Sequence, residues 1–249
     1  MSRRLARPPL GLAVTGAAVA LAMVLPVAHL VTRAADAADP IALAFDQRTL
    51  RLVWNTISLG LATTAVALGL GVAIAWLVER ADLPGRRILG LLAVLPLVVP
   101  TYVGALALVA AFGPRGLAME VPGLLGFSGA TLVLAFSTYP YVLLLARAVL
   151  SRTDPALEEA ARALGDGPGA VFRRVSLPQL RPAMAAGSLL VFLYVLSDFG
   201  AVAILRYDTL TRAIFTEYRS NFFDRAPAAV LGIVLVTLTL VAIIAERRL

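Results

Sequence analysis

Few side chains in this 249-residue sequence are suited to covalent chemistry. The sequence has no cysteine, which removes disulfides, thiolate metal sites and a thiol nucleophile. All 22 basic residues are arginine, so there is neither a Schiff-base lysine nor the lysine of a P-loop. The one histidine, His29, lies in an apolar run, where it is either a packed neutral side chain or a functional intramembrane group. We therefore expect no catalytic residue, no cofactor site and no metal site in this chain, and we expect that it is not an enzyme.

The polar segment 151–182 is the most patterned part of the sequence, and it lies between two apolar runs. Asp154 is suited to cap a helix that begins at Pro155, because an aspartate side chain accepts from the first free N–H groups and proline is tolerated at the first helical position. Glu158 and Glu159 then fall in the early turns, where carboxylates favour the positive end of the helix. The pattern predicts a short helix at the start of this segment.

Gly165 is placed to end that helix, since glycine readily adopts the left-handed conformation that is common after helix ends. A glycine-proline turn and a second short apolar stripe follow, and we expect Leu177-Pro178 to end the second helix. The first helix carries a small apolar ridge of Ala160, Ala161 and Leu164. From these residues alone, the ridge is either a docking surface for a partner or part of a solvated loop.

The composition is that of a membrane protein. Hydrophobic residues make up 60% of the chain, and the mean hydropathy is +0.87. Apolar runs of about 18 or more residues recur, and each is long enough to cross about 30 Å of hydrocarbon as a helix. Long apolar blocks exclude an ordinary soluble domain and argue against a β-barrel, whose strands give short alternating segments. We expect six membrane-spanning helices at about 10–32, 53–78, 88–112, 130–150, 183–205 and 228–245.

The distribution of arginine indicates how these spans are oriented. Most of the 22 arginines fall on segments that lie inside if the N-terminus is cytoplasmic, and segment 151–182 is one of them. This bias also explains the formal net charge of +7 without a nucleic-acid partner, since no arginine cluster has the aromatic platform that single strands require. We expect a multi-pass protein, surrounded by lipid, with both termini cytoplasmic. The first apolar run exceeds that of a usual signal peptide, so we expect a retained helix.

Prolines and one carboxylate interrupt the apolar runs. Pro100 and Pro140 each remove a backbone donor, which a membrane helix tolerates where neighbouring helices or a water-lined cavity satisfy the freed carbonyl groups. Asp198 falls within the fifth expected span, where a carboxylate is costly unless it faces protein or water. Each of these three residues is either a packing feature or part of a translocation path, and the sequence leaves both readings open.

The spacing from Glu159 to Pro178 resembles the EAA loop of binding-protein-dependent ABC transporter permeases. It consists of Glu159-Ala160-Ala161, three residues, Gly165, nine residues, Val175, one residue and Leu177-Pro178. The resemblance implies that residues 156–172 supply a coupling helix that sits in a cleft of the ATPase. It also implies that partner subunits use ATP, since this sequence has no P-loop. The implied ATPase-docking residues are Glu158, Glu159, Ala160, Ala161, Leu164, Gly165, Leu177 and Pro178.

The resemblance covers roughly residues 50–245 and implies a fold. The chain is expected to be an all-α membrane protein of about six transmembrane helices with the transmembrane domain of a type I ABC importer. Residues 1–52 would form an N-terminal transmembrane helix and external loop, and residues 53–249 the importer domain, with the EAA loop at 151–182. The implied location is the inner membrane of a bacterium or archaeon. The implied partners are a cytoplasmic ABC ATPase dimer, a second permease half, identical or homologous, and a periplasmic or surface substrate-binding protein.

A narrower resemblance concerns the cargo. The run Leu196-Ser197-Asp198-Phe199-Gly200-Ala201-Val202, with residues 207–211 and 95–102, is similar to ferric iron permeases of the same superfamily. It implies ferric iron import, and permeases for thiamine, polyamines, phosphonates or sulfate share the framework and remain alternatives. Ferric permeases often fuse two six-helix halves, so this chain would pair with itself, pair with a separate half, or be half of a fused permease. A secondary transporter driven by an ion gradient would need more intramembrane charge than Asp198 and His29 supply.

Overall fold

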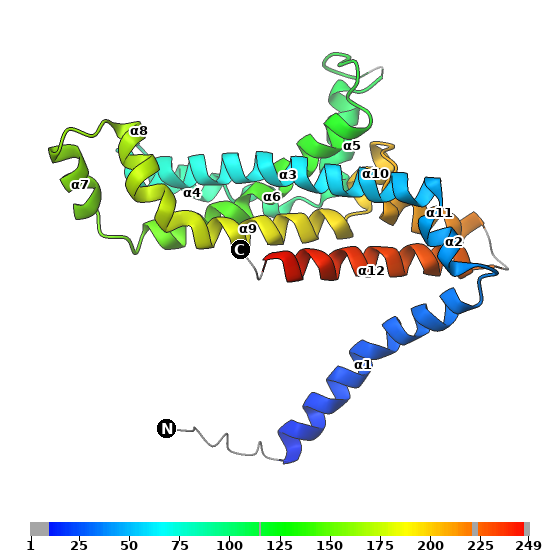
Figure 1. The fold of residues 1–249 in the computed structure, drawn as a ribbon. Helices are drawn as coiled ribbons and strands as arrows, with labels where there is room; N and C mark the ends of the chain where they lie inside the picture. Colours follow the sequence, from blue (N-terminus) through cyan, green and yellow to red (C-terminus); the bar gives the residue numbers. More distant parts are fainter. Residues whose placement is uncertain (1–9, 115, 221–223, 247–249) are drawn as a thin grey trace.

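The computed structural model describes residues 10–114, 116–220 and 224–246, and over these ranges the chain forms helices and connecting loops without a strand. Three long helices lie side by side and form the bundle, as Figure 1 shows. The long helix at the C-terminal end packs on one of these three, and the long helix at the N-terminal end contacts the C-terminal one. The long helices are α1 (Leu10–Ala35), α3 (Gln47–Arg80), α6 (Phe127–Leu150), α9 (Leu177–Ser197) and α12 (Ala226–Glu246).

The expectation of an all-helical protein with about six spans is confirmed, but two of the expected spans are not single helices. Five helices are long and apolar enough to cross a membrane, and a bent pair makes a sixth if it is counted as one span. That pair occupies the expected span 88–112, which is therefore not one straight helix. Its two parts meet at 96° between Val98 and Thr101. The first part contains α4 (Arg86–Leu92) and η1 (Leu95–Val98), and the second is α5 (Thr101–Phe112).

Proline explains the bend. Pro100 directly precedes α5 and occupies its N-cap position, and Val99 before it is extended. The ring of a proline disfavours the helical conformation in the preceding residue and supplies no N–H to continue the helix. Pro140 behaves differently, because it is buried inside α6, which continues through it for ten more residues to Leu150. The two prolines therefore have different structural effects on their spans.

The core of the bundle forms where α3, α6 and α9 pack against one another. Glycine permits the closest approach, since a Cβ at Gly71 would lie 2.6 Å from Cβ of Val142 and 2.9 Å from the carbonyl oxygen of Tyr139. Gly187 of α9 faces the same Val142 of α6. Small residues at membrane helix contacts let backbones come together in this way. Fully buried core residues include Leu59, Ala67, Leu134, Leu143, Leu180 and Val191.

The first helix stands apart from this core. Figure 1 shows α1 slanting away from the bundle, and its apolar side chains are exposed along most of its length. Its last turns pack on α12, where Leu30 lies against Gly232 and Ala34 joins a small buried cluster with Ala229 and Val230. A short helix, α2 (Pro40–Phe45), then leads into α3. The helix α1 begins, and α12 ends, toward the side of the bundle where segment 151–182 lies.

The expected fifth span is also divided. α9 ends at Ser197, and α10 (Gly200–Ile204) follows after a break of two residues, so the prediction of one helix over 183–205 is wrong. Asp198 sits in this break with extended backbone (φ −70°, ψ 131°) rather than inside a helix. α11 (Leu210–Ser220) continues from there and packs on α3 and α12. These short elements gather at the end of the bundle that is opposite segment 151–182 (Figure 1).

Candidate docking site

The polar segment between α6 and α9 folds into a helical hairpin, which we define as residues 156–176. Its first arm is α7 (Ala156–Ala163), and its start is capped because Oδ1 of Asp154 accepts from the backbone N–H of Ala156 at 3.0 Å. Gly165 follows the helix with a φ of +93°, a conformation that side chains other than glycine rarely adopt. The first arm therefore begins and ends where the sequence places it.

The second arm differs from the sequence prediction. It consists of α8 (Pro168–Val171) and a π-helical turn, η2 (Phe172–Ser176), and it continues directly into α9. Leu177-Pro178 was expected to end this helix, and that prediction is wrong because these residues begin α9 instead. The π turn explains how a proline is accommodated there: Leu177 N–H bonds to Phe172 O five residues back, and Pro178 falls in the first turn of α9, where its missing N–H costs little.

The exposed surface of α7 carries an apolar ridge. The side chains of Leu157 and Leu164 are 55% and 89% exposed, and Ala160 between them is also exposed. These positions are spaced three and four residues apart, which places them on one side of a helix. Ala161 is half-buried beside them. The ridge expected from the sequence is therefore extended by Leu157, which the sequence analysis missed although its spacing from Ala160 and Leu164 would have identified it.

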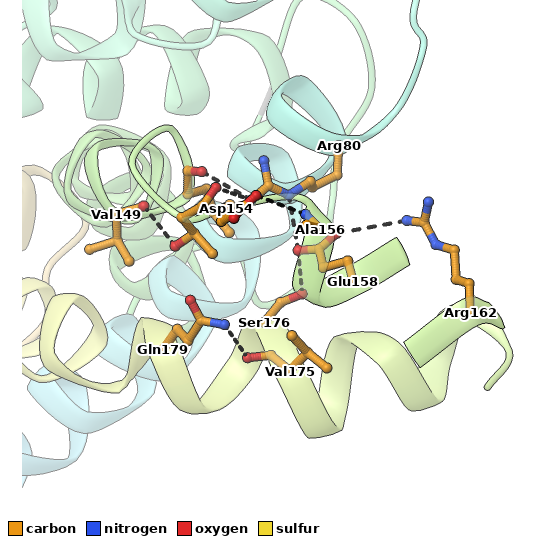
Figure 2. Close-up of polar contacts among 11 residues, drawn as sticks. Arg80, Val149, Asp154, Ala156, Glu158, Arg162, Val175, Ser176 and Gln179 are labelled. Atoms are coloured by element: carbon orange, nitrogen blue, oxygen red, sulfur yellow. Dashed lines mark hydrogen bonds and ion pairs between the residues drawn. The ribbon is translucent and has the colours of Figure 1, made fainter. Parts of the chain in front are cut away.

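The two adjacent glutamates of α7 have different surroundings. Glu159 is exposed, whereas Glu158 is buried with 3% of its side chain accessible. Figure 2 shows Glu158 turned toward the bundle, where its Oε1 accepts from Nε of Arg80 at 2.9 Å and from Oγ of Ser176 at 2.9 Å. Its Oε2 lies 3.7 Å from Nη2 of Arg162, one turn further along α7. Glu158 therefore fixes α7 to the bundle, and Glu159 is left accessible.

Arg80, the ion-pair partner of Glu158, was not predicted from the sequence. It is the last residue of α3, and its Nη2 donates to the carbonyl oxygen of Leu150 at 3.0 Å, at the end of α6. Cationic side chains are favoured near the carbonyl end of a helix, where backbone acceptors are free. The only sequence signal for this role is the position of an arginine directly after a long apolar run. Arg80 thus holds the ends of α3 and α6 against the start of the hairpin.

Other contacts hold the hairpin against α3 and stabilise it internally. Phe172 packs edge-on against Trp76 of α3 with ring centroids 5.9 Å apart, and Val171 beside it is buried. Within the hairpin, Nη1 of Arg174 pairs with Oδ1 of Asp166 at 2.8 Å. Leu177 is half-buried and Pro178 is exposed at the start of α9. Of the eight expected docking residues, the structure brings Glu159, Ala160 and Leu164 to the exposed face of α7.

Of the three candidate path residues, Asp198 and Pro100 belong to a second cluster at the opposite end of the bundle. Asp198 is 8% exposed, and its Oδ2 accepts from Oγ1 of Thr101 at 2.6 Å. Its Oδ1 accepts from the backbone N–H of Ala201 at 3.0 Å, and its carbonyl oxygen accepts from Oγ1 of Thr211 at 2.7 Å. Asp198 therefore joins the bend at Pro100 to the breaks on either side of α10. Pro140 lies within α6 and makes none of these contacts.

Solved structures share this arrangement of helices. The chain overlays with a TM-score of 0.64 on a subunit of the MetNI methionine ABC transporter, at 17% identity over 80% of this chain and 93% of that one. It overlays with a TM-score of 0.65 on a bacterial alginate ABC transporter, at 16% identity over 83% and 79% of the two chains. The fold is therefore that of an ABC importer transmembrane domain.

The sequence places the chain in a family. The pattern of the family described as "Binding-protein-dependent transport system inner membrane component" matches residues 65–249, and the chain belongs to that family of multi-pass permeases. It is 32% identical over 242 residues to the Fe(3+)-transport system permease protein FbpB 2 of Haemophilus influenzae, covering 96% of this chain but 46% of that protein. It is 29% identical over 237 residues to a probable sulfate transport system permease protein of Chlorokybus atmophyticus, covering 88% and 80%.

Proposed function

We propose that this chain is the permease subunit of an ATP-driven importer and that α7 docks on a cytoplasmic ABC ATPase. The observation that carries the docking proposal is the exposed apolar ridge of Leu157, Ala160 and Leu164 on a polar hairpin outside the apolar spans. Apolar side chains gathered on an exposed helix face are typical of protein interfaces. Glu159 beside the ridge adds an accessible carboxylate that suits a basic partner residue.

We propose that Gly165, Ala161, Leu177 and Pro178 support this surface from behind. Gly165 allows the tight turn after the ridge, Ala161 is half-buried beside the ridge, and Leu177 and Pro178 begin α9 directly after the hairpin. Glu158 has a different proposed role, because its buried carboxylate holds α7 in place and is not available to a partner. ATP would be bound and used by the partner ATPases, since this sequence has no P-loop.

The proposed orientation puts the hairpin and both termini in the cytoplasm. Arginine is more frequent on the segments at this end than on the opposite loops, as the positive-inside rule requires. The proposed partners are an ABC ATPase dimer, a second permease half, identical or homologous, and a substrate-binding protein at the opposite face. The exposed apolar length of α1 would then face lipid or the second half.

Ferric iron is the proposed cargo. The 32% identity to a ferric permease extends over 96% of this chain and includes the segment around Asp198. Sulfate is the second candidate cargo, because several sulfate permeases are 29–31% identical to this chain. Asp198 is proposed as a residue that holds the translocation path in shape rather than as a metal ligand, since its partners are hydroxyl and backbone groups.

Uptake of radiolabelled ferric iron and radiolabelled sulfate by cells that lack this chain, with and without complementation, tests the cargo. Loss and recovery of iron uptake alone would support the ferric proposal. Loss and recovery of sulfate uptake alone would refute it in favour of sulfate. The docking proposal is tested separately by co-purification of an ABC ATPase subunit with the tagged chain from the same cells.

A further inference from the structure

α7 is connected to the spans through a small number of contacts. It packs on α8 and η2 of its own hairpin, and Figure 1 shows it at the extreme end of the bundle. A displacement of the exposed ridge therefore has three routes to the spans. The chain leads from α7 back to α6 through residues 151–155, and forward through the second arm of the hairpin into α9. The third route is the polar contact of Glu158 with Arg80.

Arg80 is the point where several segments meet. Its Nε donates to Glu158 of α7, and one Nη2 donates to the carbonyl oxygens of Leu150 at 3.0 Å and Thr153 at 3.5 Å. Through the same Glu158 oxygen it is joined to Ser176 at the end of η2. The Arg80 side chain thus connects the end of α3 to the end of α6 and to both arms of the hairpin (Figure 2).

The Arg80–Glu158 ion pair is also shielded from water. The two side chains are 10% and 3% exposed, so neither has enough solvent contact to replace a lost partner. The preceding residue of α3, Glu79, provides a comparison. Glu79 pairs with Arg147 of α6 at 2.8 Å, but these side chains are 21% and 32% exposed, and the pair joins two spans without reaching the hairpin.

We infer that Arg80 is a positioning residue through which movement of α7 is passed to α3 and α6. The inference rests on the proposed docking of α7, and it adds that the hairpin and the two spans move as one rigid body because Arg80 and Glu158 are joined. Packed side chains, hydrogen bonds and ion pairs of this kind carry energetic coupling between elements that switch together. Without the ion pair, α7 would still bind the ATPase through its exposed ridge. Its movement would then change the shape of the hairpin and would not be passed on to α3 and α6.

Coupling between transport and hydrolysis tests this role. The permease–ATPase complex is reconstituted in liposomes with ferric-loaded binding protein, and iron uptake per ATP hydrolysed is measured for Arg80→Gln and for Glu79→Gln as the matched control. We expect co-purified ATPase at the unmodified level in both variants, and a ratio lowered about tenfold in Arg80→Gln only, a size typical of coupling between sites. The double variant Arg80→Glu/Glu158→Arg should recover part of the ratio. An unchanged ratio in Arg80→Gln, or loss of ATPase binding in that variant, would overturn the inference.

A second measurement does not depend on the cargo. Because the sequence has no cysteine, two spin labels can be attached uniquely at Ala163 of α7 and Leu77 of α3, both of which are exposed. With Arg80 present, the distance between them should be the same before and after trapping the complex with ATP and vanadate, and in Arg80→Gln it should change on trapping. A distance that changes on trapping with Arg80 present would refute the rigid connection. Failure of the chain to bind any ABC ATPase would instead refute the proposed function.

Discussion

Replacing Glu158 with alanine is predicted to loosen the hairpin strongly. The change removes the acceptor of the Arg80 Nε bond at 2.9 Å and of the Ser176 Oγ bond at 2.9 Å. Breaking a buried ion pair by removing one partner costs about 3–5 kcal/mol. Arg80 keeps its bond to the carbonyl oxygen of Leu150, so the lower end of that range applies. We expect the free energy of opening the hairpin to fall by about 3 kcal/mol.

Hydrogen exchange of the permease in lipid nanodiscs measures this opening. A loss of about 3 kcal/mol corresponds to exchange about 150-fold faster, since each 1.4 kcal/mol is a factor of ten. The increase should be confined to amides of residues 156–176. Glu159→Ala is the matched control, because it removes the same charge from the next residue of the same helix, where the side chain is exposed. A surface substitution of this kind is expected to change the free energy of opening the hairpin by no more than about 0.5 kcal/mol. Equal exchange in the two variants would refute the assignment of Glu158 as the buried anchor.

Three further predictions follow from particular contacts. Gly165→Asp should reduce uptake while leaving the amount of permease in the membrane unchanged, because a φ of +93° costs a non-glycine residue roughly 1–2 kcal/mol; uptake at the level of the unmodified permease would contradict this. Asp198→Ala should lower the free energy of thermal unfolding in detergent by about 1–3 kcal/mol. Asp198→Asn can still accept from Ala201 and contact Thr101, so its unfolding free energy should fall by less. An equal fall in both variants would show that these hydrogen bonds contribute little to stability. Gly71→Ala should destabilise by about 1–3 kcal/mol because its Cβ would meet Val142, while Gly69→Ala, with open space around its Cβ, should not, as thermal unfolding of both variants will show.

Local signals in the sequence were sufficient to predict where α7 begins and ends. The cap at Asp154 and the glycine at position 165 act on their immediate neighbours, so their effect on the backbone can be read without the rest of the fold. The positions of the long spans were also predictable, because each depends on a continuous run of apolar residues. Pro100 was identified as an interruption of its apolar run, but the 96° bend there and the break at Asp198 were not predicted, since apolar runs alone do not distinguish one straight span from two shorter segments.

The different roles of Glu158 and Glu159 needed the tertiary structure. The two residues are identical in type and adjacent in the same turn, and only the packing of α7 on η2 decides which one faces Arg80. Arg80 itself lies 78 residues before Glu158, and one sequence contains no signal that pairs them. The continuation of the second arm into α9 was missed for a related reason, because a π turn that accommodates Pro178 has no simple sequence signature.

Site-specific photocrosslinking tests the proposed docking of α7 most directly. A photoreactive amino acid is placed at Leu164, which is 89% exposed on the ridge, or at Leu117, which is 92% exposed in the loop before α6 at the other end of the bundle. The two positions are matched in residue type and exposure, so they differ mainly in location. Our account predicts that Leu164 crosslinks to an ABC ATPase subunit in cell membranes and that Leu117 does not. Crosslinking to the ATPase from Leu117, or its absence from Leu164, would contradict the account.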